Sequence, residues 1–183
     1  MKLQDIKIRI LELDLKGCIY LNHLSHSSRI SQFFKWISRL GDGWFWVIML
    51  LATCWVQAWQ SVIPVLYLLM TAAISTLIYK ALKHKTIRPR PYQVHQVIVL
   101  GERPLDHFSF PSGHTQHAVM ATCVLGYIQP ILLIFMLPFT VLVALSRMIL
   151  GLHYPSDVLI GAVLGGVIGG LSIWIAPMYA VQF

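Results

Sequence analysis

The sequence predicts an all-α membrane protein: a polytopic bundle of about five transmembrane helices, preceded by amphipathic helices at the membrane surface. Two observations carry this prediction. Of the 183 residues, 57% are hydrophobic and only 11% are charged, whereas about 25% of an average soluble domain is charged. In addition, three long stretches contain no Asp, Glu, Lys or Arg: Gly43 to Tyr79, His107 to Ser146 and Val158 to Phe183.

The uncharged stretches set the number of spans. A membrane-crossing helix needs about 20 apolar residues, so the first two stretches hold two spans each and the last holds one. We expect spans at about Trp44 to Trp59, Ile63 to Leu82, Ser112 to Gln129, Ile131 to Arg147 and Ser156 to Ile175. In the last span Gly161, Gly165 and Gly169 recur every fourth residue, which lets a neighbouring helix approach closely.

The first 43 residues have a different pattern, in which charges alternate with single apolar residues. Residues 1 to 16 place apolar side chains at helical spacing, so we expect an amphipathic helix that lies on the membrane, or that packs on the bundle through the same apolar stripe. A polar turn at 22 to 28 leads to a second short helix at 30 to 40, which ends at Gly41-Asp42-Gly43. No signal peptide is evident.

We therefore expect one integral-membrane domain over residues 1–183, with a surface region at 1–43, a transmembrane bundle at 44–175 and a long polar loop at 83–111. The net charge of +7 comes without a motif that reads nucleic acid, so a phosphorylated lipid within the bilayer is the better partner. Cys18, Cys54 and Cys123 are expected to be structural thiols. Nothing in the sequence indicates an oligomeric state.

Three polar clusters stand at the predicted ends of spans. Lys83 and Arg90-Pro91 follow the second span, Pro111-Ser112-Gly113-His114 opens the third, and Ser146-Arg147, His153 and Asp157 lie between the fourth and the fifth. Two membrane crossings separate the second cluster from the third. All three clusters are therefore predicted to meet on one face of the membrane and to form one site.

The residue types in these clusters suit phosphate ester cleavage. Lys83 is a point charge, while Arg90 and Arg147 are forks that match paired phosphate oxygens. Three cations can stabilise the charge on the equatorial oxygens of a phosphoryl group in the transition state. Ser112 can cap the helix that follows and Gly113 allows a ligand to approach the backbone, so this helix start is expected to bind the anion as well.

His153 and Asp157 supply the predicted nucleophile. Pro155 suits the first position of the fifth span, which puts His153 just outside the helix and Asp157 in its first turn. A carboxylate that holds one ring nitrogen leaves the other free to attack phosphorus and form a phosphohistidine. His114 would protonate the leaving oxygen and later activate water.

For individual residues of these clusters and of the loop, a non-catalytic role is the alternative. A lone His or Arg at a membrane edge is often interfacial, and Pro-Ser-Gly is a common helix start. Gln116 and His117 are expected to line the mouth of the site. The remaining loop cations, Lys80, Lys85, Arg88 and Arg103, could steer an anionic headgroup or only mark a loop. His84, His95 and His107 have no carboxylate or Cys partner at ligand spacing, so we expect no metal and no other cofactor.

The three clusters resemble the signature motifs of the type 2 phosphatidic acid phosphatase superfamily: Lys83-x6-Arg90-Pro91, Pro111-Ser112-Gly113-His114 and Ser146-Arg147-x5-His153-x3-Asp157. The resemblance implies a metal-independent phosphatase with a phosphohistidine on His153, Asp157 in support and His114 as acid and base. It also implies that Lys83, Arg90, Ser112, Gly113 and Arg147 hold the phosphoryl group.

The implied substrates are phosphate or pyrophosphate esters of membrane lipids, with undecaprenyl pyrophosphate and phosphatidylglycerophosphate first. The short chain is similar to the compact, bacitracin-resistance type of undecaprenyl pyrophosphate phosphatase, whereas many bacterial members have six spans. A lipid A phosphatase, a lipid phosphotransferase and a non-enzymatic lipid-phosphate binder or transporter are the alternatives.

The expected location is the inner (plasma) membrane of a bacterium. With five spans the N-terminus and the site share one face, and all 14 Lys and Arg residues fall on that face. Positive charge in short loops normally marks the cytoplasm, whereas the family resemblance implies a periplasmic or extracellular site. We expect the outward-facing site, because catalysis itself requires part of this charge.

Overall fold

The computed structural model describes residues 3–57 and 62–176. The regular elements in these ranges are all helices, so the predicted all-α class is confirmed. They are α1 (Leu3–His23), η1 (Leu24–His26), α2 (Ser28–Gly41), α3 (Trp44–Gln57), α4 (Val62–Thr86), α5 (Pro91–Val94), α6 (Gly113–Ile128), η3 (Pro130–Leu132), α7 (Leu133–Ile149) and α8 (Pro155–Ile175).

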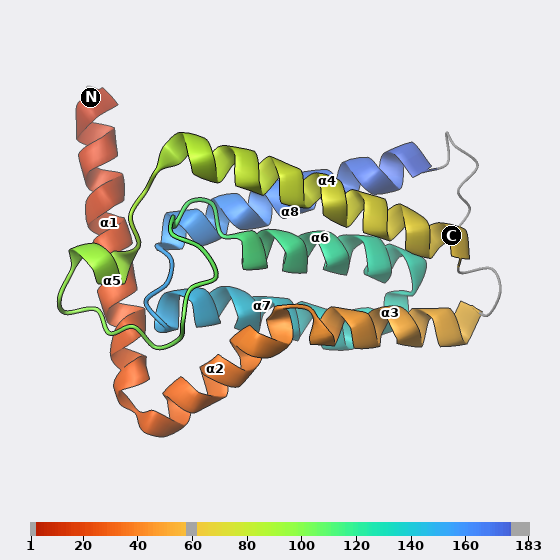
Figure 1. Cartoon of the computed structure of the whole chain (residues 1–183), viewed down its shortest axis with the longest axis horizontal. Coiled ribbons are helices and arrows are strands. Elements are labelled where there is room, and N and C mark those ends of the chain that lie inside the picture. Colours follow the sequence, from red (N-terminus) through yellow and green to blue (C-terminus); the bar gives the residue numbers. More distant parts are fainter. Residues whose placement is uncertain (1–2, 58–61, 177–183) are drawn as a thin grey trace.

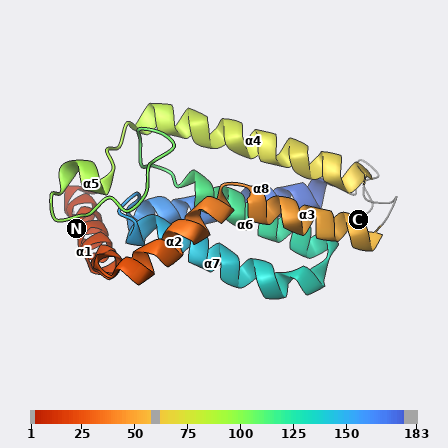
Figure 2. The ribbon, with the colours of Figure 1, turned by 60° about the horizontal axis from the view of Figure 1, so that its bottom comes forward.

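Five helices, α3, α4, α6, α7 and α8, run alongside one another at the positions of the five predicted spans (Figures 1 and 2). Within residues 3–57 and 62–176, three segments are long and apolar enough to cross a membrane, Val65–Val94, Pro130–Ile149 and Pro155–Ile175, and the chain is accordingly a membrane protein. Helix α3 is apolar but shorter, with 14 residues, and α6 has 16 residues and a polar first turn. Trp59, the predicted end of the first span, lies outside the described residues.

Helix α6 is the centre of the bundle and packs against α3, α4, α7 and α8. Its buried side chains Met120, Val124 and Leu125 form the main hydrophobic cluster with Leu68 of α4 and Met136 of α7. Burial of such side chains stabilises each by about 1.5–3 kcal/mol. Because α6 starts at the polar end of the bundle, this packing also fixes the residues of its first turn.

The glycine repeat of α8 faces α6, as predicted. A β-carbon at Gly165 would lie 2.3 Å from the backbone oxygen of Gln116, and one at Gly161 would lie 2.6 Å from the backbone oxygen of Ser112. Only glycine allows this approach without a shift of the helices. The backbone N–H of Ser112 donates to the backbone oxygen of Asp157 at 3.0 Å. The starts of α6 and α8 are therefore held together.

The N-terminal helix α1 lies across the polar end of the bundle, transverse to the five helices that run alongside one another (Figure 1). This direction agrees with a helix that lies on the membrane surface. The predicted end at residue 16 was wrong, because α1 continues to His23. Tertiary contacts extend the helix: Cys18 is completely buried, and the Asn22 side chain donates to the backbone oxygens of Val99 and Ile149 at 2.9 Å each.

The face of α1 that meets the protein is not its apolar stripe. Asp14, Cys18 and Asn22, one helical turn apart, are buried, whereas Ile10 and Leu13 are exposed. The prediction that packing on the bundle would use the apolar stripe was therefore wrong. A polar and small face docks on the bundle, and the apolar side chains point away from it.

Candidate active site

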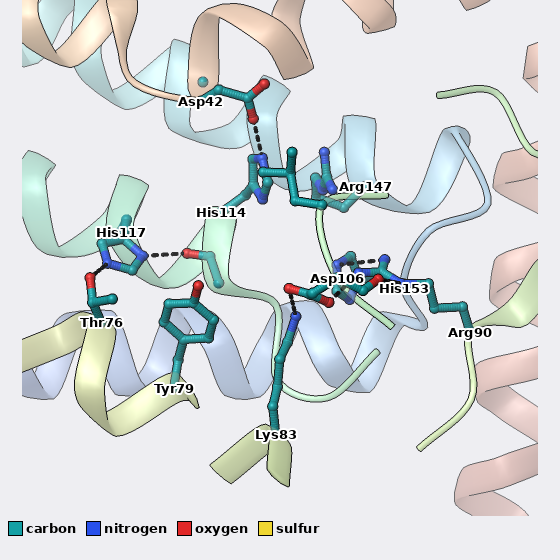
Figure 3. Close-up of a pocket in the computed structure, with 13 residues that line it drawn as sticks. Asp42, Thr76, Tyr79, Lys83, Arg90, Asp106, His114, His117, Arg147 and His153 are labelled. Carbon is teal, nitrogen blue, oxygen red and sulfur yellow. Dashed lines mark hydrogen bonds and ion pairs between the residues drawn. The ribbon is translucent and has the colours of Figure 1, made fainter. Parts of the chain in front are cut away.

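A cavity of about 220 Å³ opens at the polar end of the bundle and brings residues from all three predicted clusters together (Figure 3). Its lining is Gly41, Asp42, Thr76, Tyr79, Lys83, Arg90, Leu105, Asp106, Gly113, His114, His117, Arg147 and His153. The expectation that two membrane crossings return the second and third clusters to one end of the bundle is met. Two predicted site residues, Ser112 and Asp157, lie behind this lining.

Each cation of the cavity comes from the end of an element. Lys83 lies in the last turn of α4, Arg90 is the N-cap residue of α5, and Arg147 lies in the last turn of α7. The side chains are buried, with Arg90 1% and Arg147 2% exposed, so their charges act in a region from which water is largely excluded. Three positive charges therefore converge on one small volume, as the sequence predicted.

Asp106, from the long polar loop, lies between two of these cations. Its carboxylate accepts from Lys83 Nζ at 2.5 Å and from Arg90 Nη2 at 2.7 Å. Burial alone would raise the pKa of Asp106, but the hydrogen bonds and charges of Lys83 and Arg90 outweigh burial and lower the pKa below its ordinary value. A carboxylate thus occupies the position where the cations would hold an anionic ligand.

Arg147 lines the cavity and also contacts α2. Nη1 donates to the hydroxyl of Ser38 in α2, while Nε is buried and has no hydrogen-bond partner among the described residues. A buried donor without a partner is costly.

His153 lies in the short connection between α7 and α8 and is 1% exposed. Its Nε2 is 3.3 Å from Arg90 Nη1, on the side of the cavity, and its Nδ1 is 3.7 Å from Asp157 Oδ2. Asp157 thus faces Nδ1 as expected, but at a distance longer than a hydrogen bond, and Nδ1 has no hydrogen bond within the described part of the chain. Burial, followed by the charges of Arg90, Arg147 and Lys83, lowers the pKa of His153 well below its ordinary value. The ring is therefore neutral at physiological pH, and because a guanidinium group can only donate, the electron pair of Nε2 accepts from Arg90 Nη1.

His114, the second residue of α6, pairs with a residue that the sequence reasoning did not select. Its Nε2 contacts Oδ1 of Asp42, which lies in the turn between α2 and α3 (Figure 3). We interpreted Gly41-Asp42-Gly43 only as a helix stop. Asp42 is 72 positions away from His114 and belongs to a sequence pattern typical of a turn. Nothing in that local pattern indicates a pairing with His114.

Ser112 and Gly113 meet their predictions in part. Ser112 is the N-cap residue of α6, but its hydroxyl pairs with that of Thr115 at 3.0 Å instead of capping the backbone. Fully buried, Ser112 does not line the cavity, and the expected side-chain cap was wrong because Thr115 offers a closer partner. Gly113 lines the cavity, where a β-carbon would come within 3.3 Å of the Tyr79 ring.

Two further residues of α6, both expected to line the mouth of the site, have different positions. His117 lines the cavity as expected, with Nε2 2.9 Å from the hydroxyl of Thr76 in α4 (Figure 3). Gln116 does not line it: the side-chain amide donates to the backbone oxygen and the hydroxyl of Ser75 at 3.0 and 2.9 Å. The prediction for Gln116 was wrong because this amide joins α6 to α4 inside the bundle.

Comparison with known proteins places the chain in a family. Residues 64–179, which include every predicted site residue, match the model of the PAP2 superfamily. The chain belongs to the PAP2 superfamily. The crystal structure of the first transmembrane PAP2 type phosphatidylglycerolphosphate phosphatase from Bacillus subtilis is similar, with a TM-score of 0.75, 25% identity and coverage of 93% of this chain and 87% of that chain.

Two curated PAP2 relatives are similar over part of their length. A decaprenylphosphoryl-5-phosphoribose phosphatase of Mycobacterium tuberculosis is 34% identical over 101 residues, which is 54% of this chain and 51% of the relative. A lipid A 1-phosphatase of Rhizobium etli is 29% identical over 118 residues, 62% of this chain and 50% of the relative. The chain thus spans about half the length of the curated relatives that it matches.

One further residue of the PAP2 site was not selected from the sequence. For Arg88, two positions before Arg90, the sequence favours either a steering cation or a loop residue. Arg88 instead donates to Asp157 Oδ1 at 2.6 Å and to Asp14 Oδ2 of α1 at 2.7 Å. Lys80, Lys85 and Arg103, grouped with it before, are exposed. The position of Arg88 inside the Lys83-x6-Arg90 motif was the feature of the sequence that could have indicated a role in the site.

Proposed function

We propose that this PAP2 protein is an integral-membrane lipid phosphatase that works through a phosphohistidine on His153. The observation that carries the proposal is the cavity that Lys83, Arg90, Arg147, His153 and His114 line together, with Arg90 Nη1 3.3 Å from Nε2 of His153. The cavity is lined by the end of α4, the start of α6 and the end of α7, at the end of the bundle where the phosphorylated headgroup of a lipid would be.

The first half of the reaction transfers the phosphoryl group to the protein. Nε2 of His153 gives its electron pair to phosphorus while the bond from phosphorus to the leaving oxygen breaks. His114 gives a proton to that oxygen from its protonated form, which the pair with Asp42 stabilises. Lys83, Arg90 and Arg147 stabilise the charge that spreads over the three equatorial oxygens.

The second half returns the protein to its starting state. His114, now neutral, takes a proton from a water molecule, whose oxygen attacks the phosphorus. The bond from phosphorus to Nε2 breaks and its electrons return to His153. Inorganic phosphate leaves, and His114 is protonated again. Asp157 supports the positive charge that the His153 ring carries in the phosphorylated state.

The proposed substrates are phosphate or pyrophosphate esters of membrane lipids, with undecaprenyl pyrophosphate or phosphatidylglycerophosphate as the first candidates. Similarity to proteins named for a decaprenyl-linked phosphate and for phosphatidylglycerolphosphate supports both classes. Lipid A phosphate is the alternative, which the similarity to a lipid A 1-phosphatase favours. A phosphotransferase would use the same first half and pass the phosphoryl group to another acceptor.

The proposed location is the bacterial inner membrane, with the cavity on the outer face. The basic residues of α1 and α2 lie at the same end of the bundle as the cavity, so the charge pattern by itself favours the cytoplasm. Part of that charge has a different cause, since Lys83, Arg88, Arg90 and Arg147 all make contacts within the site.

The proposal is tested by phosphate release from the purified protein in detergent micelles. The substrates are farnesyl and undecaprenyl pyrophosphate, phosphatidylglycerophosphate, phosphatidic acid and lipid A. Saturable release from at least one of them is expected, and the ratio of the kcat/KM values ranks the classes. A protein that binds these lipids but releases no phosphate would be a binder or a transporter, and the proposal would be wrong.

A further inference from the structure

The helix α1 reaches the catalytic end of α8 through one buried acid, Asp14. Asp14 is 4% exposed. Its Oδ1 accepts from the backbone N–H of Ser156 at 2.8 Å, and its Oδ2 accepts from the Ser156 hydroxyl at 2.5 Å. The approach is close along the helix, since a β-carbon at Gly17 would lie 3.0 Å from Pro155. A carboxylate from the surface helix thus caps the first turn of α8, the turn that contains Asp157.

Arg88 joins Asp14 to Asp157. Its Nη2 donates to Asp14 Oδ2 at 2.7 Å and its Nη1 donates to Asp157 Oδ1 at 2.6 Å. The other oxygen of Asp157 accepts from the backbone N–H of Tyr154 at 2.9 Å and lies 3.7 Å from His153 Nδ1. A continuous chain of contacts therefore runs from α1 through Arg88 and Asp157 to the proposed nucleophile.

The backbone around Arg88 is held in an unusual conformation. Ile87, directly before it, has a φ of 44°, in the left-handed region that β-branched residues rarely adopt. The guanidinium group of Arg88 also lies over the Tyr154 ring, 4.1 Å from its centroid. A conformation of this kind persists only where surrounding contacts determine it. Here those contacts fix the direction of Arg88 toward the two carboxylates.

The net charge of the linked side chains Asp14, Arg88 and Asp157 explains the presence of a second acid, Asp14. Arg88 paired with Asp157 alone would neutralise the carboxylate that has to support a positive His153 ring. With Asp14 sharing Arg88, the three side chains together carry one net negative charge next to His153. In a buried site, where the effective dielectric constant is low, one additional negative charge strongly stabilises a positive His153 ring. Arg88 can therefore orient Asp157 without cancelling its charge.

We propose that Asp14 and Arg88 are positioning residues of the reaction, which act on His153 through Asp157. The surface helix α1 is then part of the catalytic apparatus as well as a contact to the bilayer surface. This inference rests on the proposed function, because it concerns the nucleophile of that reaction. The Asp14→Asn variant tests it with little change of shape, since an amide oxygen can still accept from the backbone N–H of Ser156.

The experiment measures kcat and KM of the purified full-length protein in detergent micelles. The substrate is farnesyl pyrophosphate, or another lipid phosphate of the panel named above if the protein hydrolyses that one faster. Asp14→Asn is expected to lower kcat about tenfold or more, with KM changed by less than about threefold, because the phosphate contacts remain. Arg88→Lys, which keeps the charge but loses the fork, is expected to do the same. Glu12→Gln, the same kind of change at an exposed position of α1, is the matched control and leaves kcat unchanged.

A double-mutant cycle separates this role from a purely structural one. If Asp14 acts through Asp157, Asp14→Asn has little further effect on the residual kcat of Asp157→Asn. Multiplicative losses in the double variant would contradict the inference, and so would an unchanged kcat in Asp14→Asn. A loss of kcat that follows a loss of folded protein, measured by thermal unfolding, would also overturn it. If the wild type hydrolyses no lipid phosphate at all, the proposed function has failed instead.

Discussion

Two carboxylates outside the sequence motifs contact the residues that we expect to carry out the chemistry. Asp42 pairs with His114, and Asp106 lies between Lys83 and Arg90. The cations and both histidines of the site could be selected from the sequence because their spacing in the motifs is fixed. The carboxylates could not, because each belongs to a turn or a loop whose local pattern only predicts a change of chain direction.

Asp42→Asn is expected to reduce kcat with a smaller effect on KM. The amide cannot support the protonated form of His114, which gives its proton to the leaving oxygen. Since general acid catalysis contributes about 10²–10⁴-fold, we expect a loss of about tenfold or more. Steady-state phosphate release measures it, with Asp5→Asn in the exposed part of α1 as the control. An unchanged kcat in Asp42→Asn would mean that His114 does not depend on this pair.

Asp106→Asn is expected to strengthen the binding of phosphate. The Asp106 carboxylate, whose lowered pKa keeps it ionised, competes with an anionic ligand for Lys83 and Arg90. The amide competes less, so the inhibition constant of inorganic phosphate should fall severalfold. Competitive inhibition of lipid phosphate hydrolysis measures this constant. Weaker inhibition in the variant would show instead that Asp106 is needed to hold the two cations in place.

At the level of elements, the positions of the five bundle helices followed from the uncharged stretches, and the glycine repeat correctly predicted a close helix contact. The extent and the buried face of α1 did not follow. Its periodicity predicted an apolar contact with the bundle, whereas Asp14 and Asn22 make the contact through hydrogen bonds. Periodicity reports where apolar side chains gather, and both a bilayer and a protein core can cover such a stripe.

Gly165→Ala tests the packing of α8 on α6. Its β-carbon would lie 2.3 Å from the Gln116 backbone oxygen, so the two helices must move apart. Overpacking of this kind costs about 1–3 kcal/mol, and the unfolding temperature in detergent should fall by several degrees. Gly170→Ala is the matched control in the same helix, since a β-carbon there meets no atom within 4 Å. Equal unfolding temperatures of the two variants would contradict this packing.

At the scale of the whole molecule, the topology predicted from the sequence is enough to place the three motifs in one site. Counting membrane crossings is sufficient for that step because helices in a bilayer must run from one face to the other. The side of the membrane was not determined in this way. The charges that normally indicate the cytoplasmic face are partly the same charges that make up the cavity.

Labelling of Ser27→Cys tests the orientation. Ser27 is exposed, in the turn between α1 and α2. In an active variant without Cys18, Cys54 and Cys123, we expect a membrane-impermeant maleimide to label Ser27→Cys in intact spheroplasts. Labelling only after lysis would place the cavity in the cytoplasm.

The proposed reaction depends most directly on His153, and one comparison tests it. We measure phosphate release from the preferred lipid by the wild type, by His153→Ala and by His84→Ala, each with and without EDTA. His84→Ala is the control, since it changes an exposed histidine at the end of α4. The expected result is full activity of the wild type and of His84→Ala in EDTA, and no phosphate release by His153→Ala. Turnover by His153→Ala at the wild-type rate, or loss of wild-type activity in EDTA, would contradict a metal-independent phosphohistidine mechanism.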